Sequence, residues 1–472
     1  MKIKEAEYKP YKITSFQGNP LIEAIEPALS LQCFASDLTH RVISEDCAEI
    51  SDFERELSVE LVDLTYTVHP ELYTLYKTIL KNILTGYLHR NPLSVEMKAE
   101  QHKASVEKSY QISASMNLSK CISIIGVPGT GKTLAVRKCL SLLPKVLKHT
   151  QYKDQRLMLD QIVFVEFQAP VTKTRRGFVL SFFNAIDEAI GTKYYDEWKG
   201  KSIAIPVLIQ EAKKIALNHS LGMVFIDEVQ RCASNDCNKD DYSTLEFIDD
   251  FFNSVGVPLI VAGTPKARPL FNTTMSTTRR LSSSRKFNFD PIKDDLESLK
   301  NDEPSYWDIF LKGFYYPSLL NGEFEFDVPF MRRVYELTAG LPAMTARLMR
   351  LSYEQAIESG EEVLSIELLE EVYQDQFDLI HNALLSLATG NDLGFEDILP
   401  EGEFKCPTDK AIEDAIARDI AFHEKLARKK GADDGEVLEF EDIEQDYMPL
   451  GDMRNLKGLP KDDLIAQLGV SL

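Results

Sequence analysis

The chain has 472 residues, of which 27% are charged and 44% hydrophobic, and its 53 basic and 74 acidic side chains give a formal net charge of −21. This composition excludes a disordered, collagenous or disulfide-scaffold protein, and the length suits about two to four domains. Because no apolar run reaches the roughly 18 residues of a membrane span, and the seven cysteines are scattered, we expect a cytoplasmic protein with reduced thiols and no membrane partner.

Residues 1–118 are predicted to form an N-terminal extension with helices. Between residues 70 and 85, apolar side chains recur at helical spacing. Pro70 suits the first turn of this helix, and Gly86 suits its C-terminal cap.

From residue 119 to residue 293, short apolar runs alternate with amphipathic helices. The runs are residues 121–127, 162–167, 223–227, 258–263 and 286–292. Continuous apolar strands that alternate with helices indicate a parallel sheet that is buried on both faces. We therefore predict an α/β core.

From residue 294 to residue 388 the strand signal disappears, and helical stretches are joined by turns such as Ala339-Gly340-Leu341-Pro342. This pattern predicts a small helical domain. The remaining segment, 389–472, is acidic: from Asn391 onward it has 10 basic and 21 acidic residues. We expect a flexible tail with short helices.

A complete phosphate-binding pattern, G-x-x-x-x-G-K-[ST], runs from Gly126 to Thr133 between a predicted strand and a predicted helix. Its glycines would let backbone N–H groups at a helix N-terminus approach phosphates. Lys132 would neutralise the outer phosphates, and the Thr133 hydroxyl would ligate Mg²⁺. The predicted ligands are ATP and Mg²⁺. The predicted nucleotide-binding residues are Gly126, Pro128, Gly129, Thr130, Gly131, Lys132, Thr133 and Asp227.

A second motif places two carboxylates at the end of the apolar strand 223–227, where open α/β sheets bind their ligands. Asp227 is predicted to hold Mg²⁺, together with Thr133, and Glu228 to orient and deprotonate the attacking water. Thr264, at the end of the next strand, is predicted to sense the γ-phosphate or the water, although a threonine before proline is also an ordinary turn residue. These motifs predict an ATP hydrolase.

Two basic clusters each allow two interpretations. One arginine of the first cluster could stabilise the transition state at a neighbouring subunit's nucleotide, or the cluster could be a solvated or DNA-facing loop. The second cluster could contact the DNA backbone, or it could be a solvated helix start. The first cluster comprises Arg279, Arg280 and Arg285. The second comprises Lys173, Thr174, Arg175 and Arg176.

The order of these motifs resembles that of the AAA+ ATPases. Within that superfamily the chain is most similar to the TnsC family, the ATP-dependent regulators of transposons that encode the TnsA, TnsB, TnsC and TnsD set. Over about residues 15–385, the resemblance is carried by Gly18-Asn-Pro-Leu-Ile-Glu-Ala-Ile25, Gly86-Tyr-Leu-His-Arg90-Asn-Pro92, Phe225-Ile-Asp-Glu-Val-Gln230 and Gly256-Val-Pro-Leu-Ile-Val-Ala-Gly-Thr-Pro-Lys-Ala-Arg268. It implies an AAA+ P-loop NTPase core with an N-terminal helical extension and a C-terminal helical lid.

The resemblance also implies a switch that assembles with ATP as a ring or helical filament of identical subunits around double-stranded DNA in a bacterial cytoplasm. The N-terminal extension would bind a target selector, either a protein of the TnsD type or an RNA-guided complex. The acidic tail would bind transposase and endonuclease subunits of the TnsB and TnsA type. One departure concerns the lid: Ala343 follows Pro342 where many AAA+ lids carry an arginine, and Arg347 could substitute for it.

Two other functions stay open. The first is a scaffold that uses ATP only to hold an oligomer together; the intact Glu228 argues against it. The second is an initiator- or signalling-type ATPase of the same superfamily. A winged-helix domain after the lid would favour an initiator, and the acidic tail shows no strand-and-turn signal for one.

Overall fold

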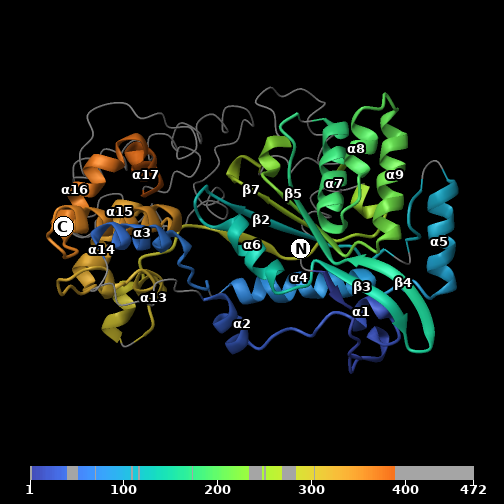
Figure 1. The fold of residues 1–472 in the computed structure, drawn as a ribbon, viewed down its shortest axis with the longest axis horizontal. Coiled ribbons are helices and arrows are strands. Elements are labelled where there is room, and N and C mark those ends of the chain that lie inside the picture. The colour runs from blue at the N-terminus through green and yellow to red at the C-terminus, as the bar shows by residue number, and fades with distance from the viewer. Residues whose placement is uncertain are drawn as a thin grey trace, which may run out of the picture. The chain divides into compact units, whose positions relative to one another are not determined.

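The structure is a computed structural model (Figure 1), and it describes residues 3–39, 51–69, 71–107, 110–114, 117–172, 174–232, 247–248, 251–267, 283–301 and 303–388. The chain forms two compact units. The first combines Met1–Ser36, His69–Gly126 and Lys132–Phe289, and the second combines Asp37–Val68, Val127–Gly131 and the chain from Asp290 onward. The predicted tail, 389–472, lies outside the described residues.

The first unit is built on a five-stranded parallel sheet, which confirms the predicted α/β core. The strand order is β5 (Phe164–Gln168), β6 (Met223–Asp227), β7 (Leu259–Gly263), β2 (Cys121–Gly126) and β8 (Lys286–Phe289). The three central strands, β6, β7 and β2, are buried at every position. They read as continuous apolar runs because helices cover both faces of the sheet.

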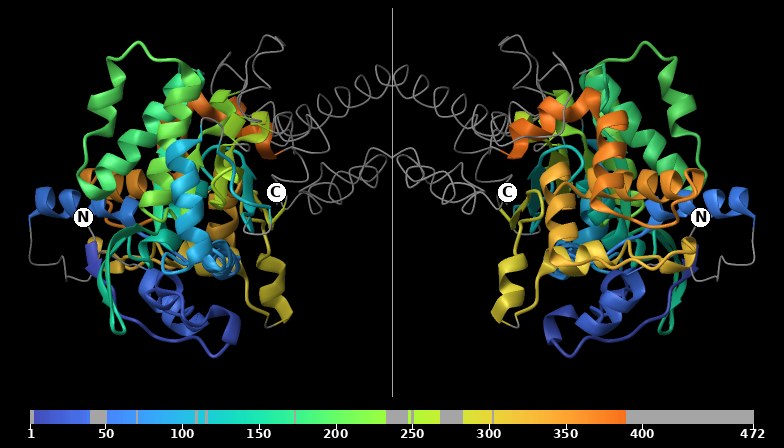
Figure 2. Two further views of the ribbon diagram at one scale, coloured as in Figure 1. Left: turned by 90° about the vertical axis from the view of Figure 1, so that its right-hand side faces the viewer. Right: turned by 90° about the vertical axis from the view of Figure 1, so that its left-hand side faces the viewer.

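Helices flank this sheet on both sides (Figures 1 and 2). One face is covered by α7 (Arg175–Ile190) and α9 (Ile205–Asn218), with α8 (Tyr194–Lys199) against α7 and α5 (Val95–Val106) against α9. The other face carries α6 (Lys132–Ser141) and α4 (Leu72–Tyr87), which pack on each other. The apolar side of α7, which includes Phe178, Phe182 and Phe183, forms one core with Val224 and Ile226 of β6.

A smaller sheet was not predicted. Its order is β1 (Ile3–Glu5), β3 (Val146–Tyr152) and β4 (Gln155–Ile162), with β1 parallel and β4 antiparallel to β3. Residues 162–167 are predicted as one strand, but β4 ends at Ile162 and β5 begins at Phe164. The β3–β4 hairpin is mixed polar and apolar along its length, and its turn uses Lys153 at a left-handed φ of 51° rather than a glycine. It therefore lacks the usual hairpin signal.

The N-terminal region contributes α1 (Pro20–Glu23), α2 (Leu31–Leu38) and α4. The predicted cap at Gly86 is wrong, because α4 continues to Tyr87. A Cβ atom at Gly86 would lie 2.8 Å from Pro258 Cγ, so this glycine lets the helix approach the chain that leads into β7. The predicted role of Pro70 falls outside the described residues.

The second unit is helical, which confirms the predicted helical C-terminal region. Its helices are α3 (Asp52–Val59), α13 (Tyr306–Lys312), α14 (Val328–Thr338), α15 (Pro342–Glu358), α16 (Ile366–Gln376) and α17 (His381–Ala388). The sequence did not reveal that α3 and the 3₁₀ helix η3 (Glu60–Leu64) pack against α15, although they belong to the N-terminal region. Arg332 and Arg333 of α14 are largely covered and pair with carboxylates of the same unit.

None of the helices in the described ranges is long and apolar enough to cross a membrane.

Candidate nucleotide-binding site

The phosphate-binding pattern forms the loop between β2 and α6. Gly129 and Gly131 have left-handed φ angles of 85° and 84°, which glycine adopts without cost. A Cβ atom on Gly126 would overlap the carbonyl oxygen of Phe289 on β8, so this glycine is required for the pairing of β2 with β8. The Thr130 hydroxyl donates a hydrogen bond to the Val127 carbonyl, 2.9 Å away, and closes the loop from inside.

Lys132 begins α6, and its side chain is buried. Its Nζ donates a hydrogen bond to the Gly126 carbonyl at 2.7 Å. The carbonyl at the base of the loop therefore holds the ammonium group at the N-terminus of α6. A cation and free N–H groups at a helix N-terminus are what an incoming phosphate requires.

The two predicted metal ligands, Thr133 and Asp227, meet. The Thr133 hydroxyl, on α6, donates a 2.6 Å hydrogen bond to Oδ2 of Asp227 at the end of β6. The Asp227 side chain is buried, and its Oδ1 accepts a hydrogen bond from the Glu228 N–H at 2.8 Å. Hydroxyl and carboxylate oxygens are the protein ligands that Mg²⁺ prefers. The pair thus fits a magnesium ion held between the loop helix and β6.

Glu228 directly follows β6 and has a left-handed φ of 57°. For a residue with a side chain this conformation costs about 1–2 kcal/mol. Such strain persists only where neighbours hold it, and it is common at active sites. Oε2 of Glu228 accepts a 2.6 Å hydrogen bond from Nε2 of Gln230 and lies 3.9 Å from Nε of Arg231.

Thr264 directly follows β7, beside β6, and is buried. Its backbone N–H donates a 3.2 Å hydrogen bond to Oε1 of Gln230. The structure therefore joins Thr264 to Glu228 through Gln230, which is not among the predicted site residues. The one sequence feature that points to Gln230 as a site residue is its position two residues after Glu228, in the stretch 225–230.

Arg285 is the only member of the first basic cluster within the described ranges; Arg279 and Arg280 fall outside them. It precedes β8, whose first residue, Lys286, pairs with Ser123, while Gly126 pairs with the last residue of that strand. At about 3.3 Å per residue, Arg285 is roughly 10 Å or more from the loop end of the sheet. It lies over the Phe287 ring, 5.5 Å from the centroid. Arg285 is therefore not beside the phosphate loop of its own chain.

In the second basic cluster, Lys173 is outside the described residues, and the other three members have separate partners. The Thr174 side chain caps α7 by accepting a hydrogen bond from the Gly177 N–H. Arg175 is exposed and lies over the Phe247 ring, 5.7 Å from the centroid. Arg176 donates from Nη2 to three carbonyls near the end of α8, those of Trp198, Lys199 and Lys201. These carbonyls explain why a positive charge is tolerated at the start of α7.

The lid supplies a backbone contact where an arginine was expected. The Ala343 N–H, in the first turn of α15, donates a 3.1 Å hydrogen bond to the Gly129 carbonyl of the loop. Arg347, the expected substitute, instead donates to the Gln376 carbonyl at 2.8 Å and lies over the Phe377 ring. The Arg347 guanidinium therefore contacts the C-terminal end of α16.

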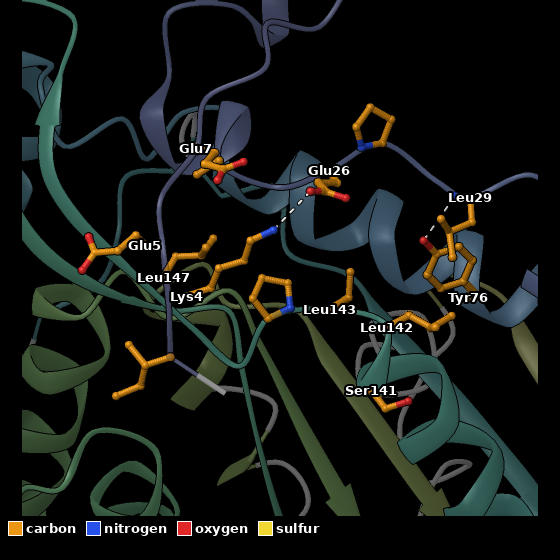
Figure 3. Close-up of a pocket in the computed structure, with 14 residues that line it drawn as sticks. Lys4, Glu5, Glu7, Glu26, Leu29, Tyr76, Ser141, Leu142, Leu143 and Leu147 are labelled. Atoms are coloured by element: carbon orange, nitrogen blue, oxygen red, sulfur yellow. Dashed lines mark hydrogen bonds and ion pairs between the residues drawn. The ribbon is translucent and has the colours of Figure 1, made fainter. Parts of the chain in front are cut away.

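A separate cavity of about 470 Å³ lies between β1, residues 24–29 and the end of α6 (Figure 3). No residue of the phosphate loop lines it. Its lining lysine, Lys4, is paired with Glu26 at 3.2 Å. The cavity is thus distinct from the nucleotide site and presents no group with an evident chemical role.

Together, the parallel sheet, the glycine loop between β2 and α6, and the helical regions form an AAA+ P-loop fold. Residues 116–271 match the family model of an AAA domain, about one third of the chain. No curated protein matches the sequence. The resemblance to the TnsC family remains a prediction.

Among solved structures, the chain is similar to Drosophila ORC bound to DNA, with 13% identity, a TM-score of 0.34, and 80% of this chain and 92% of that chain covered. It is also similar to the Aeropyrum pernix ORC2 protein in ADPNP and ADP complexes, with 13% identity, a TM-score of 0.36 and coverages of 70% and 95%. Cdc6p from Pyrobaculum aerophilum has 16% identity, a TM-score of 0.36 and coverages of 66% and 79%. Similarity at this level supports no statement about function.

Proposed function

We propose that this chain is an ATP-hydrolysing AAA+ switch that assembles on duplex DNA. The observation that carries the proposal is the 2.6 Å contact between the Thr133 hydroxyl and the Asp227 carboxylate, at the end of a glycine loop and next to Glu228. A structural turn would not need a buried carboxylate against a hydroxyl at this position. A nucleotide site does, because these oxygens would hold the magnesium ion of ATP.

The remaining residues have distinct tasks in hydrolysis. The backbone N–H groups of the loop and the Lys132 ammonium bind the phosphates. Mg²⁺ supplies charge neutralisation at the phosphate oxygens. Glu228 orients the attacking water and accepts its proton, and Thr264 reports the presence of the γ-phosphate. Glu228 is suited to this role because about a third of its side chain is exposed and can meet water.

We further propose that assembly and DNA binding depend on the two basic clusters. Arg285 lies away from the phosphate loop of its own subunit, a position compatible with an arginine finger that acts on the nucleotide of a neighbouring subunit. Arg279 and Arg280 stay candidates for the same role because they belong to the same basic cluster in the sequence. Arg175 is exposed and can contact a DNA phosphate. Lys173, which lies outside the described residues, stays a candidate from the sequence alone. Arg176 is held by the α8 carbonyls, so its contribution to DNA binding would be indirect.

The finer proposal is that this switch regulates DNA transposition. The N-terminal extension would bind a target selector of the TnsD type or an RNA-guided complex, and the tail would bind transposase and endonuclease subunits of the TnsB and TnsA type. The support is the resemblance in the stretches that begin at Gly18, Gly86 and Gly256. The direct test is whether the purified chain, with ATP and duplex DNA, binds a transposase of the TnsB type or a replicative helicase. Binding of the helicase alone would favour the initiator function.

The switch itself is tested by electron microscopy and DNA binding with ATP, a non-hydrolysable analogue, ADP or no nucleotide. Lys132→Ala should abolish nucleotide-dependent DNA binding. Glu228→Gln should bind ATP but turn it over slowly, so that assemblies on DNA persist. Matched controls are Lys148→Ala on β3 and Glu96→Gln on α5, both exposed and outside the site. An identical oligomer on DNA in all four conditions would refute the proposal.

A further inference from the structure

The Gln230 carboxamide joins two parts of the site that belong to different strands. On one side Nε2 donates to Oε2 of Glu228 at 2.6 Å. On the other side Oε1 accepts from the Thr264 N–H at 3.2 Å. A glutamine side chain can do both, since its amide group is a donor and its carbonyl oxygen an acceptor.

The backbone around Gln230 is shaped to allow this bridge. Gln230 lies in the 3₁₀ helix η4 (Val229–Cys232), which directly follows the left-handed residue Glu228. On β7, a Cβ atom at Gly263 would lie 3.0 Å from Oε1 of Gln230 and 3.0 Å from Cβ of Ala267. A side chain at position 263 would therefore crowd the carboxamide, and glycine leaves room for it.

The other candidate to hold Glu228 is Arg231, and its geometry is weaker. Its Nε lies 3.9 Å from Glu228 Oε2, beyond hydrogen-bond distance, while its Nη1 donates to Oε1 of Gln168 on β5 at 3.0 Å. Arg231 is thus directed toward β5. The short, charge-assisted bond from Gln230 is the contact that fixes the Glu228 carboxylate.

We infer that Gln230 is a positioning residue, which sets the Glu228 carboxylate relative to the Thr264 turn so that the water-activating group and the phosphate-sensing group move as one unit. The inference rests on the proposed function, because it assumes that Glu228 acts in hydrolysis. In this role Gln230 acts through Glu228. Its loss should therefore slow turnover without weakening ATP binding.

The test uses the full-length chain and two substitutions. Gln230→Met has a similar length and removes both hydrogen bonds. Gln230→Glu keeps an acceptor for the Thr264 N–H but puts a second carboxylate against Glu228, which repels it. We expect kcat to fall about 10- to 100-fold in Gln230→Met, the effect of one hydrogen bond to a charged group, and at least as far in Gln230→Glu. The dissociation constant for ATP should stay within twofold.

The matched control is Gln210→Met. Gln210 is partly buried, as Gln230 is, and its carboxamide also joins two groups, although both belong to the backbone: it accepts from the Tyr110 N–H and donates to the Ala104 carbonyl. Its substitution should lower the thermal midpoint of unfolding but leave kcat unchanged. A second control adds Gln230→Met to Glu228→Gln. If Gln230 acts through Glu228, the double variant should keep the residual turnover of Glu228→Gln within about twofold.

The outcomes separate the inference from the function on which it rests. If Glu228→Gln turns over ATP as fast as the unaltered chain, Glu228 is not the base and the proposed function is wrong at that point. If Glu228→Gln is slow but Gln230→Met keeps the original kcat, the inference alone is overturned. A Gln230→Met variant with weaker ATP binding and a lower thermal midpoint but unchanged kcat would show a purely structural glutamine, which also overturns it.

Discussion

The conformation of Gly131 gives a quantitative test of the phosphate loop. Its φ is 84°, in the left-handed region, and a Cβ atom built on it has no other atom within 4 Å. Gly131→Ala therefore adds backbone strain to the loop without a steric clash. For an alanine this strain is about 1–2 kcal/mol, which corresponds to a factor of roughly 5 to 30 in an equilibrium constant.

The strain of Gly131→Ala lowers either the stability of the chain or its affinity for ATP, depending on which conformation the loop adopts without nucleotide. If the empty loop keeps its conformation, the free energy of unfolding falls by about 1–2 kcal/mol and the ATP affinity is unchanged. If the empty loop relaxes, stability is preserved, and ATP must restore the strained conformation, so its dissociation constant rises about 5- to 30-fold. The two losses should therefore add up to about 1–2 kcal/mol.

Both quantities can be measured in the Glu228→Gln background, where ATP is expected to persist. Titration calorimetry with ATP and Mg²⁺ gives the affinity, and denaturant unfolding gives the stability. The control is Gly200→Ala, because Gly200 has a right-handed φ of −91° and no atom near its Cβ position. If Gly131→Ala matches Gly200→Ala in both measurements, the left-handed loop is not the conformation that binds phosphates.

Two further predictions concern stability. The Glu362 carboxylate accepts hydrogen bonds of 2.7 Å from both Nη atoms of Arg55, so Arg55→Met should lower the free energy of unfolding by about 3 kcal/mol. The control is Arg156→Met, at an exposed position on β4. An equally small loss of stability in both variants would show that the Arg55–Glu362 pair does not stabilise the fold. Burial lowers the pKa of His149 in the folded chain. When the pH is below the unfolded-state pKa of about 6.5, this histidine is therefore protonated more in the unfolded chain than in the folded chain. Stability should therefore fall as the pH drops from about 6.5. In thermal unfolding measured from neutral to mildly acidic pH, His149→Gln should show a smaller fall. The same pH dependence in the variant and the unaltered chain would contradict this prediction.

The sheet and the phosphate loop could be predicted from the sequence because their signals are local. The central strands read as apolar runs since both of their faces are covered, and the loop chemistry is contained in the eight residues from Gly126 to Thr133. The acidic pair followed from the strand that delivers it. In each case the residues that determine the structure are neighbours in the chain.

The remainder depends on partners distant in the chain. Gln230 acquires its role from Thr264 on the next strand, and Arg176 from carbonyls more than 20 residues away. Likewise, α3 belongs to the helical unit because Arg55 reaches Glu362, a contact that no local pattern encodes. The sequence gives the type of a polar residue but not the group that it contacts. That contact determines whether the residue has a binding role or a structural one.

The same distinction applies to the stretches that resemble the TnsC family. Asn19 donates to the Tyr87 carbonyl at 2.8 Å, and Asn91 donates to the Gly18 carbonyl at 2.9 Å, so the stretches 18–25 and 86–92 bind each other. Arg90 is buried, where desolvation lowers its pKa to about 10, and it donates to the Leu221 carbonyl before β6.

These residues therefore attach the N-terminal region to the sheet and are not available to a partner. Buried packing residues can carry a resemblance in architecture, but they do not identify a partner. A target selector would have to contact other residues of the N-terminal region, for instance the exposed apolar side chains of α3 and η3, which are Phe53, Leu57, Leu61 and Leu64.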